Sequence, residues 1–577
     1  MELSRRQMLR AGLAASALGI SGCSSDSNDQ STGTGGASTP TQTATATSTQ
    51  SQSQQQQNRA CGPAVDVSGS ITQDTTWDCR YRMTGDVTVT NGATLFVTGA
   101  LVEAEQDTIL SVEDGTLVTD GTQQEPPEFR SVEGDPGSWK GIEITADSTD
   151  SSLRNAVVRD GGASGWANVY VQNGAAVSFN GCLFDRSATY GIDAEENTTL
   201  QRFRNCSFRD NQTRAMRVPA TVLGSLDTAT AYDNTTEPGG VDVRNETVTS
   251  DTIWLDIGEN YYFPSGVAIE AEVVIREGAD LRFGQDTRFS VETGGLLRAE
   301  GSSGSQVTFT GEQTNTPGYW HGIEIVSDNR NNLSYATVVD GGGDGWANVY
   351  VQNGGRVSID NCTLRASETY GLHAEANTTL ESFTGNDVWA GGTGSMYIPL
   401  ANLDDIDADT TFTGSGDQTR VEVTAETVPR QTTWPALDTT VHFTESCSID
   451  APVTVDPGAS FTFAQGSLLS VEQGGSLNAV GTANDPITFE GETDVSGFWG
   501  GIEVVSLEPD NVFDHCEIAN GGSGGWANVY IQDSGMATVR NSTLRDSSTY
   551  AIYVEDGGRL TRSNNTFSGN ASGQVSP

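Results

Sequence analysis

Apolar and polar residues alternate in short runs that recur along the chain every 23 to 27 residues. In the first third of the chain such runs begin at Ile142, Val169, Ile192 and Met216. Alternation of this kind is typical of a β-strand with one buried face. Stretches rich in glycine and asparagine, such as residues 172–174, separate the runs and predict tight turns. The turns are too short for crossover helices, so the pattern predicts strands that stack from one coil of the chain to the next.

Two longer motifs return three times at intervals of about 180 residues. The string Gly-Trp-Ala-Asn-Val-Tyr contains Trp166, Trp346 and Trp526, and the string Trp-x-Gly-Ile-Glu begins at Trp139, Trp320 and Trp499. Self-similarity at a fixed period indicates one structural unit made three times. It also predicts that surface chemistry is presented in triplicate along one axis. We expect the repeats to span residues 61–245, 246–425 and 426–577, the last ending in a polar C-terminal cap.

Composition favours the same all-β interpretation. Hydrophobic residues make up only 35% of the chain and glycine occurs 67 times, which suits many short strands and turns. Short strands about one coil apart predict a parallel β-helix solenoid. An antiparallel β-sandwich is the alternative, but it does not explain why strands one period apart are so alike.

At this point the chain resembles the right-handed parallel β-helix repeat superfamily, the pectate-lyase-like solenoids. The resemblance is carried by turns of the type Asn-Cys-x-Phe and by the run from Val471 to Thr482 with Pro486-Ile-Thr-Phe489, and the turns are Asn205–Phe208, Asn361–Leu364 and Asn541–Leu544. It covers residues 65 to 570 and implies a right-handed parallel β-helix. It implies little about activity, because this fold hosts lyases, hydrolases, adhesins and inert scaffolds.

The N-terminus has the features of an export address. Arg5 and Arg6 precede a short apolar run, as in a twin-arginine signal, and Ile-Ser-Gly before Cys23 resembles a lipobox. We expect residues 1–22 to be a cleaved signal peptide and Cys23 to carry the lipid. Residues 23–60 are rich in Ser, Thr and Gln and are expected to form a disordered tether. The protein would then be anchored on the outer face of the cytoplasmic membrane, at the cell surface, through lipid alone.

The charge of the chain is strongly acidic. Asp and Glu number 76 against 30 Lys and Arg, for a net charge of -46, and Lys140 is the only lysine. A polyanion of this size repels nucleic acid, which disfavours a role in nucleic-acid binding. The composition resembles that of proteins from extremely halophilic archaea, where concentrated salt screens the self-repulsion of a carboxylate-rich surface.

Cysteines and glycosylation sequons have different expected roles. Cys61 and Cys79 flank the start of the folded body and are candidates for a capping disulfide. Cys182 and Cys206 lie one coil apart, where stacking would bring them within bridging reach, but small apolar cysteines at this turn are expected to be free and buried. Sequons at the coil turns should form an internal asparagine ladder: Asn205, Asn361 and Asn541. Sequons expected in loops are candidate glycosylation sites: Asn197, Asn211, Asn234 and Asn377.

Stacked coils should place aromatic and acidic side chains in neighbouring outward columns. Aromatic rings pack on the apolar faces of sugars, and carboxylates bind sugar hydroxyls, so we expect a glycan-binding surface. Rings that pack on one another or beneath a loop would give the same pattern. The expected binding residues are Trp139, Glu143, Trp166, Tyr170 and Tyr190 in the first repeat; Trp320, Glu324, Trp346, Tyr350 and Tyr370 in the second; and Trp499, Glu503, Trp526, Tyr530 and Tyr550 in the third.

Catalysis is a second hypothesis. A polysaccharide lyase needs acidic Ca²⁺ ligands and a base, which the first repeat could supply from Tyr170, Asp193, Glu195 and Arg217. The later repeats have His373 and Tyr553 in place of Asp193, so this set would exist only once. Apart from this Ca²⁺, the sequence indicates no cofactor and no metal site.

The leading functional hypothesis is therefore a monomeric, non-enzymatic surface scaffold that binds an extracellular glycan or another envelope component. The alternatives are a Ca²⁺-dependent polysaccharide lyase or glycoside hydrolase, and a purely structural spacer.

Overall fold

The computed structural model describes residues 61–148, 150–234, 239–414, 418–424 and 426–577. The predicted signal peptide with Arg5 and Arg6, the lipidated Cys23 and the tether lie outside the described residues. The chain divides into two units at Val65, and the second unit, Asp66–Pro577, is compact. Among the described residues, none of the helices has the length and apolar character needed to span a membrane.

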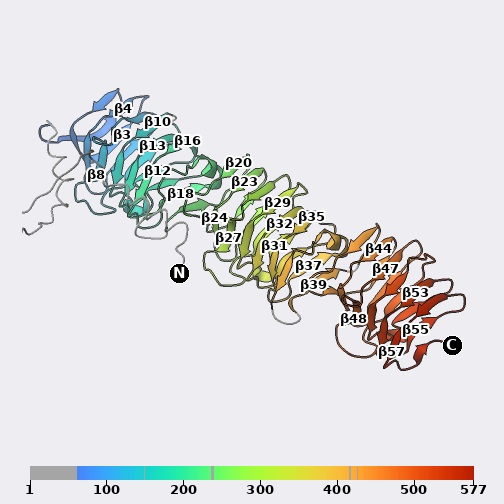
Figure 1. The fold of residues 1–577 in the computed structure, drawn as a ribbon. Helices are drawn as coiled ribbons and strands as arrows, with labels where there is room; N and C mark the ends of the chain where they lie inside the picture. Colours follow the sequence, from blue (N-terminus) through green and yellow to red (C-terminus); the bar gives the residue numbers. More distant parts are fainter. Residues whose placement is uncertain (1–60, 149, 235–238, 415–417, 425) are drawn as a thin grey trace, which may run out of the picture. The chain divides into compact units, whose positions relative to one another are not determined.

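The second unit is a parallel β-solenoid made of coils of short strands (Figure 1). Side chains of its strands point alternately into and out of the coil, as in β53, where Ala537 and Val539 are buried. The inner positions form one continuous apolar core from Trp77 to Ile552. The fold is therefore the predicted parallel β-helix and not an antiparallel sandwich. Its helices among the described residues are short 3-10 turns: η2 (Ala163–Gly165), η3 (Ala220–Ser225), η4 (Gly343–Gly345), η5 (Leu400–Asp405) and η7 (Ser523–Gly525).

Each repeat has one strand family that carries its Gly-Ile-Glu and Asn-Val-Tyr motifs, here called the motif face. The motif face of the first repeat contains β6 (Ile109–Val112), β9 (Gly141–Ile144), β12 (Val169–Val171), β15 (Ile192–Ala194) and β18 (Met216–Pro219). That of the second contains β22 (Val267–Ile269), β25 (Arg288–Val291), β28 (Gly322–Ile325), β31 (Ala347–Val351), β34 (Tyr370–Ala374) and β37 (Met396–Pro399). That of the third contains β40 (Thr427–Val428), β43 (Cys447–Ile449), β46 (Leu468–Val471), β49 (Gly501–Val504), β52 (Val529–Ile531), β55 (Tyr550–Val554) and β58 (Gly573–Val575).

A second face of each repeat forms separate six-stranded sheets. They are β2 (Thr75–Trp77), β4 (Thr94–Val97), β7 (Thr116–Thr119), β10 (Ser151–Arg154), β13 (Ala176–Asn180) and β16 (Thr199–Arg204); β20 (Thr252–Trp254), β23 (Glu272–Arg276), β26 (Leu296–Glu300), β29 (Asn331–Ser334), β32 (Arg356–Asp360) and β35 (Thr379–Thr384); and β41 (Thr432–Trp434), β44 (Pro452–Val455), β47 (Ser476–Val480), β50 (Val512–Asp514), β53 (Met536–Arg540) and β56 (Arg559–Ser563).

The remaining strands form the third face. In the first repeat it contains β1 (Val65–Ile71), β3 (Arg80–Val89), β5 (Leu101–Ala104), β8 (Glu128–Ser131), β11 (Val157–Arg159), β14 (Leu183–Asp185) and β17 (Ser207–Arg209). The third face of the second repeat starts at β19 (Val241–Arg244), in the last residues of the first repeat, and continues with β21 (Asn260–Phe263), β24 (Asp280–Phe283), β27 (Val307–Gly311), β30 (Ala336–Val339), β33 (Thr363–Arg365), β36 (Asp387–Trp389) and β38 (Thr411–Thr413). The third face of the third repeat starts at β39 (Val421–Thr424), in the last residues of the second repeat, and continues with β42 (Val441–Phe443), β45 (Ser460–Phe463), β48 (Ile487–Gly491), β51 (Cys516–Ala519), β54 (Thr543–Arg545) and β57 (Thr566–Ser568).

The three motif faces do not lie on one continuous sheet. The first motif face pairs through β18 with β19 and becomes the third face of the second repeat, and β37 pairs with β39 in the same way. The number of coils explains this change of face. Seven inter-coil steps lead from Ile142, on the first motif face, to Phe309, on the third face of the second repeat, and they pass through Val169, Ile192, Met216, Val241, Tyr261 and Leu281. The next motif strand, β28, begins one face further on. The motifs therefore recur three times along the solenoid, as predicted, but each repeat presents its motif face on a different side of the coil.

Five asparagines have the opposite exposure to the one predicted: three expected inside are exposed, and two expected in loops are buried. Asn205, Asn361 and Asn541 are exposed and adopt left-handed backbone φ angles of 51, 55 and 51°. Asn211 and Asn234 are buried, and Asn234 Nδ2 donates to the Asn211 carbonyl at 2.6 Å. A buried, hydrogen-bonded amide cannot accept a glycan, so the latter two belong to the internal ladder and not to the glycosylation candidates. Asn197 and Asn377 are exposed, and their glycosylation stays a prediction.

The cysteines of the solenoid wall are shielded from solvent. Cys61 and Cys79 are disulfide-bonded, whereas five other described cysteines are free and buried: Cys182, Cys206, Cys362, Cys447 and Cys516. Burial raises the pKa of the Cys362 and Cys447 thiols to about 12. These side chains act as small apolar residues of the core.

We expect the native protein to resist thiol alkylation. At pH 8 a thiol with a pKa near 12 is ionised in only about one molecule in ten thousand, and the thiolate is the reactive form. N-ethylmaleimide followed by peptide mass spectrometry should leave Cys362 and Cys447 unmodified in the folded protein and modify both in denaturant. Equal labelling rates in the two conditions would contradict their burial.

Candidate ligand-binding face

Three of the predicted binding residues are inner core residues. Trp139, Trp320 and Trp499 are 0% exposed. The Trp320 ring stacks on Phe283 at 4.3 Å, and its Nε1–H donates to the Val339 carbonyl at 2.7 Å. Trp499 repeats this arrangement with Phe463 at 4.0 Å. These tryptophans cannot contact a ligand, and their assignment to the binding surface is corrected.

The second set of tryptophans lies on the outside and is half-buried. Trp166, Trp346 and Trp526 each pack against the tyrosine four residues later, at centroid distances of 4.8, 4.9 and 4.8 Å. A fully buried asparagine anchors each loop: Asn348 Oδ1 accepts from the Gly341 amide at 2.9 Å, and its Nδ2 donates to the Arg365 carbonyl at 2.9 Å. The repeated string thus fixes each tryptophan at the edge of its motif face.

A hydrogen-bond network recurs on all three motif faces. In the second repeat Glu324 accepts from Ser290 at 2.8 Å and from Gln352, and Tyr350 donates to Glu375 at 2.9 Å. The equivalent groups of the other repeats make the same bonds: Ser111, Gln172 and Glu143 with Tyr170 and Glu195, and Ser470, Gln532 and Glu503 with Tyr530 and Glu555. These bonds hold the outward side chains in fixed positions before any ligand arrives.

On the first motif face the candidate catalytic residues form ion pairs. Asp193 is 1% exposed and accepts from Arg217 and, at 2.6 Å, from Arg244. Tyr170 donates to Glu195, and burial together with this bond raises the pKa of the phenol. A phenol with a raised pKa is a poor base at neutral pH. The structure brings Tyr170, Asp193, Glu195 and Arg217 together, but in an arrangement that favours a structural role.

The first face also engages Tyr190. Its hydroxyl donates to Asp242 at 2.6 Å, and the Arg217 guanidinium lies 4.7 Å from its ring centroid. Burial and the neighbouring Asp242 raise the pKa of Tyr190. Polar groups with this many internal partners leave few positions for an external ligand.

The second motif face carries an aromatic row at the same level. Glu324, Tyr350, His373, Tyr397 and Glu422 are direct neighbours on successive strands. The His373 ring lies 4.5 Å from Tyr350 and 4.8 Å from Tyr397, and all three rings are half-buried. We call Tyr350, His373 and Tyr397 the aromatic row.

Tyr370 packs beside this row, with its ring 5.8 Å from His373, and its hydroxyl donates to Glu422 at 2.9 Å. Burial lowers the pKa of His373, so the imidazole is neutral at neutral pH and the row presents uncharged rings. His373 and Tyr397 occupy the positions of Asp193 and Arg217 of the first repeat, and the alternating pattern predicts that both lie on the outer side of their strands.

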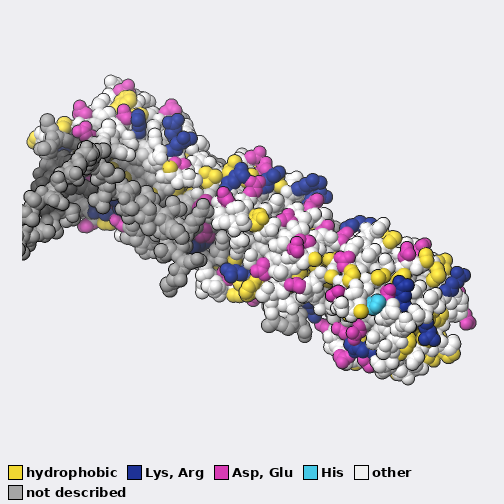
Figure 2. Space-filling view, viewed as in Figure 1, with side chains coloured by type: hydrophobic (Ala, Val, Ile, Leu, Met, Phe, Trp, Pro, Cys, Tyr) yellow, Lys and Arg dark blue, Asp and Glu magenta, His cyan; other side chains and the backbone are white. Residues whose placement is uncertain are grey.

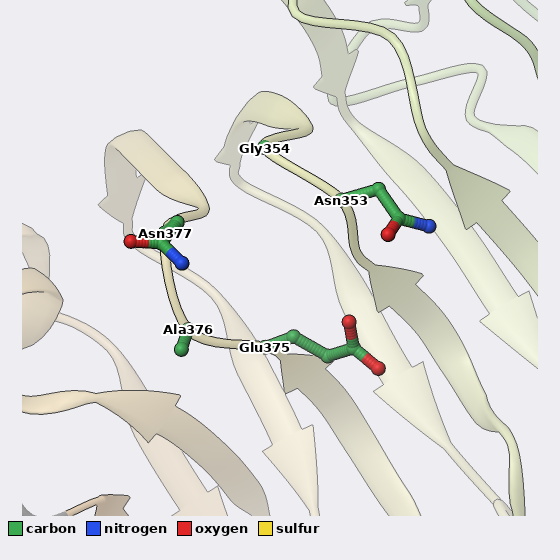
Figure 3. Close-up of a pocket in the computed structure, with 5 residues that line it drawn as sticks. All are labelled: Asn353, Gly354, Glu375, Ala376 and Asn377. Carbon is green, nitrogen blue, oxygen red and sulfur yellow. The ribbon is translucent and has the colours of Figure 1, made fainter.

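A hollow of about 630 Å³ adjoins the aromatic row. It is lined by Asn353, Gly354, Glu375, Ala376 and Asn377, and Figure 3 shows these residues on two adjacent turns. Glu375 connects the hollow to the row, because its carboxylate accepts the Tyr350 hydroxyl. Amide and carboxylate groups next to half-exposed rings are the groups that bind polyhydroxylated molecules.

On the third motif face the row is shorter. The Tyr530 and Tyr553 rings stack at 4.9 Å, and Tyr550 lies 5.8 Å from Tyr553. The second repeat therefore combines the longest aromatic row with a hollow.

Acidic and basic side chains are interspersed on the side of the molecule that Figure 2 shows.

A match to a family model supports the architecture. Residues 460–576 match a family model described as a right handed beta helix region. Among solved structures, the alginate lyase AlyGC of the PL6 family matches with 11% identity and a TM-score of 0.20, covering 83% of this chain and 87% of the lyase. An arginine mutant of the same lyase matches with 11% identity and a TM-score of 0.19, covering 84% and 87%. No curated protein matches the sequence.

Proposed function

We propose that this right-handed β-helix protein is a non-enzymatic surface scaffold that binds a neutral glycan at the aromatic row of its second repeat. The observation that carries the proposal is the row of Tyr350, His373 and Tyr397, which leads into the hollow beside Glu375. The lipid anchor and cell-surface location belong to the proposal and rest on the Cys23 and Arg5-Arg6 motifs.

The charges around the row favour an uncharged ligand. Glu324, Glu375 and Glu422 surround the three rings, and carboxylates accept hydrogen bonds from sugar hydroxyls but repel uronate or sulfate groups. The nearby Arg420 is engaged by Glu422 at 2.9 Å and by Glu492 at 2.7 Å. A neutral hexose polymer can stack its apolar faces on the rings without displacing these ion pairs.

The proposal predicts that Tyr397→Ala weakens glycan binding about tenfold. One aromatic contact contributes about 0.5–1.5 kcal/mol beyond its buried area, and 1.4 kcal/mol corresponds to a factor of ten. Neutral glycans that bind the unmodified protein on an array, in concentrated KCl, would be titrated against the variant by calorimetry. Tyr350→Phe keeps the ring and should lose less affinity than Tyr397→Ala.

The third repeat offers the matched control. Tyr553→Ala removes a stacked ring at the position equivalent to His373, and binding to the second repeat should be unchanged. Equal loss in both variants, or unchanged binding in Tyr397→Ala, would reject the proposed row. Release of unsaturated ends from acidic polysaccharides with Ca²⁺ would instead support the lyase hypothesis.

A further inference from the structure

Three potential metal ligands from three successive coils meet at the edge of the second motif face. Asp286 precedes β25, His321 precedes β28, and Asp344 lies in η4 before β31. Their ligand atoms all lie within 4.8 Å of one another, and His321 Nε2 is 3.3 Å from Asp344 Oδ2. We propose that Asp286, His321 and Asp344 bind a divalent transition-metal ion such as Zn²⁺.

The scaffold holds these residues in place through bonds between coils. The Asp286 amide donates to the Tyr319 carbonyl at 3.0 Å, and the His321 amide donates to the Thr287 carbonyl at 2.8 Å. The His321 ring lies 5.8 Å from Trp346 with an interplanar angle of 6°, so stacking fixes the plane of the imidazole. Only the two carboxylates have to move for the cluster to close on an ion.

Arg288, two residues after Asp286, is already paired with a carboxylate. The Arg288 guanidinium lies over the Trp346 ring at 5.1 Å, and its Nε contacts Glu324 at 2.8 Å. Glu324 thus already neutralises the charge of Arg288. A divalent ion would offset the mutual repulsion of Asp286 and Asp344.

The three repeats provide an internal comparison. The positions of Asp286, His321 and Asp344 are occupied in the first repeat by Asp107, Lys140 and Ser164, and in the third by Gly466, Gly500 and Gly524. The backbone is alike at these sites, with φ of 57° at Asp286 and 58° at Asp107, and 54° at Asp344 and 56° at Ser164. The ligands are therefore complete in one repeat, a lysine ammonium replaces the imidazole in another, and all three side chains are absent from the last.

The donor set selects the class of metal. One imidazole nitrogen with two carboxylate oxygens suits borderline ions such as Zn²⁺ or Co²⁺, whereas Ca²⁺ and Mg²⁺ prefer oxygen alone. Ligand atoms around a tetrahedral ion at 2.0–2.1 Å are about 3.3 Å apart, which His321 and Asp344 already match. Water would complete the coordination. The inference is independent of glycan binding, because it concerns other residues and another ligand.

The test is Zn²⁺ titration of the full-length protein by calorimetry, in concentrated KCl with excess Mg²⁺ to occupy nonspecific carboxylates. We expect one Zn²⁺ per chain. His321→Lys, which introduces the residue of the first repeat, should weaken Zn²⁺ binding more than tenfold. His515→Ala is the matched control, because His515 also contacts an aspartate, Asp514, at 2.9 Å but lies outside the cluster.

A gain-of-site variant provides a second readout. The pair Lys140→His and Ser164→Asp, together with the native Asp107, should raise the stoichiometry from one Zn²⁺ to two, and Co²⁺ should give a second visible absorption increment. Circular dichroism verifies folding of each variant. No Zn²⁺ uptake by the unmodified protein, or unchanged uptake in folded His321→Lys, would overturn the proposal, and a stoichiometry that stays at one would overturn the claim that these positions suffice.

Discussion

Replacing Trp320 with alanine is expected to lower the free energy of unfolding by about 3–5 kcal/mol. The side chain is 0% exposed and stacks on Phe283 with an interplanar angle of 7°. Alanine would leave a large cavity at the centre of a coil and remove the Nε1–H donor from the Val339 carbonyl. Chemical denaturation followed by far-ultraviolet circular dichroism, in concentrated KCl, measures the change.

Two variants separate packing from hydrogen bonding at this position. Trp320→Phe retains an aromatic ring and should cost less than the alanine variant, while the Val339 carbonyl loses its partner. Trp346→Ala removes a half-exposed ring of equal size and should cost clearly less than Trp320→Ala. Equal destabilisation by Trp320→Ala and Trp346→Ala would contradict the placement of Trp320 in the core and of Trp346 on the outer surface.

The alternation of apolar and polar residues was sufficient to predict the coils, but not which tryptophan points inward. Both strings recur with nearly the same period, so periodicity treats Trp139 and Trp166 alike. The local signal is the glycine two residues after Trp139: Gly141 has a φ of 116°, and a Cβ there would lie 2.0 Å from the Ala167 carbonyl oxygen. That close approach marks a sharp corner, and the residues before it turn into the core.

The inward-facing position beside each asparagine predicted for the ladder lies one residue further along the chain. At the coil turn Asn361 is exposed, whereas the next residue, Cys362, is buried and its amide donates to Asn386 Oδ1 at 2.8 Å. A shift of one position moves a side chain from one side of the wall to the other. A sequon identifies the asparagine but not the side of the wall on which it lies.

One repeat period alone could not predict that the motif face moves to a different side of the coil from one repeat to the next. Coil steps differ in length, for example 27 residues from Ile142 to Val169 and 20 from Val241 to Tyr261. The face on which a motif lies depends on the sum of all these steps, so small local differences decide it. The aromatic row could be predicted from the sequence more easily than the position of the motif faces, because its residues lie in consecutive coils of one repeat.

Replacing Asp193 with asparagine is expected to destabilise the protein by about 3–5 kcal/mol, because it leaves two half-buried guanidiniums without their shared carboxylate. Asp193 is 1% exposed and lies between Arg217 and Arg244, which come from the next two coils. Asp120→Asn is the control, because its ion pair with Arg154 is exposed and should contribute less than about 1 kcal/mol. The measurement is denaturant unfolding of both variants beside the unmodified protein. A catalytic Asp193 would instead leave stability nearly unchanged when neutralised, since active-site charges are commonly held at a cost to the fold. The stability difference therefore decides whether this carboxylate joins the coils or is retained for chemistry.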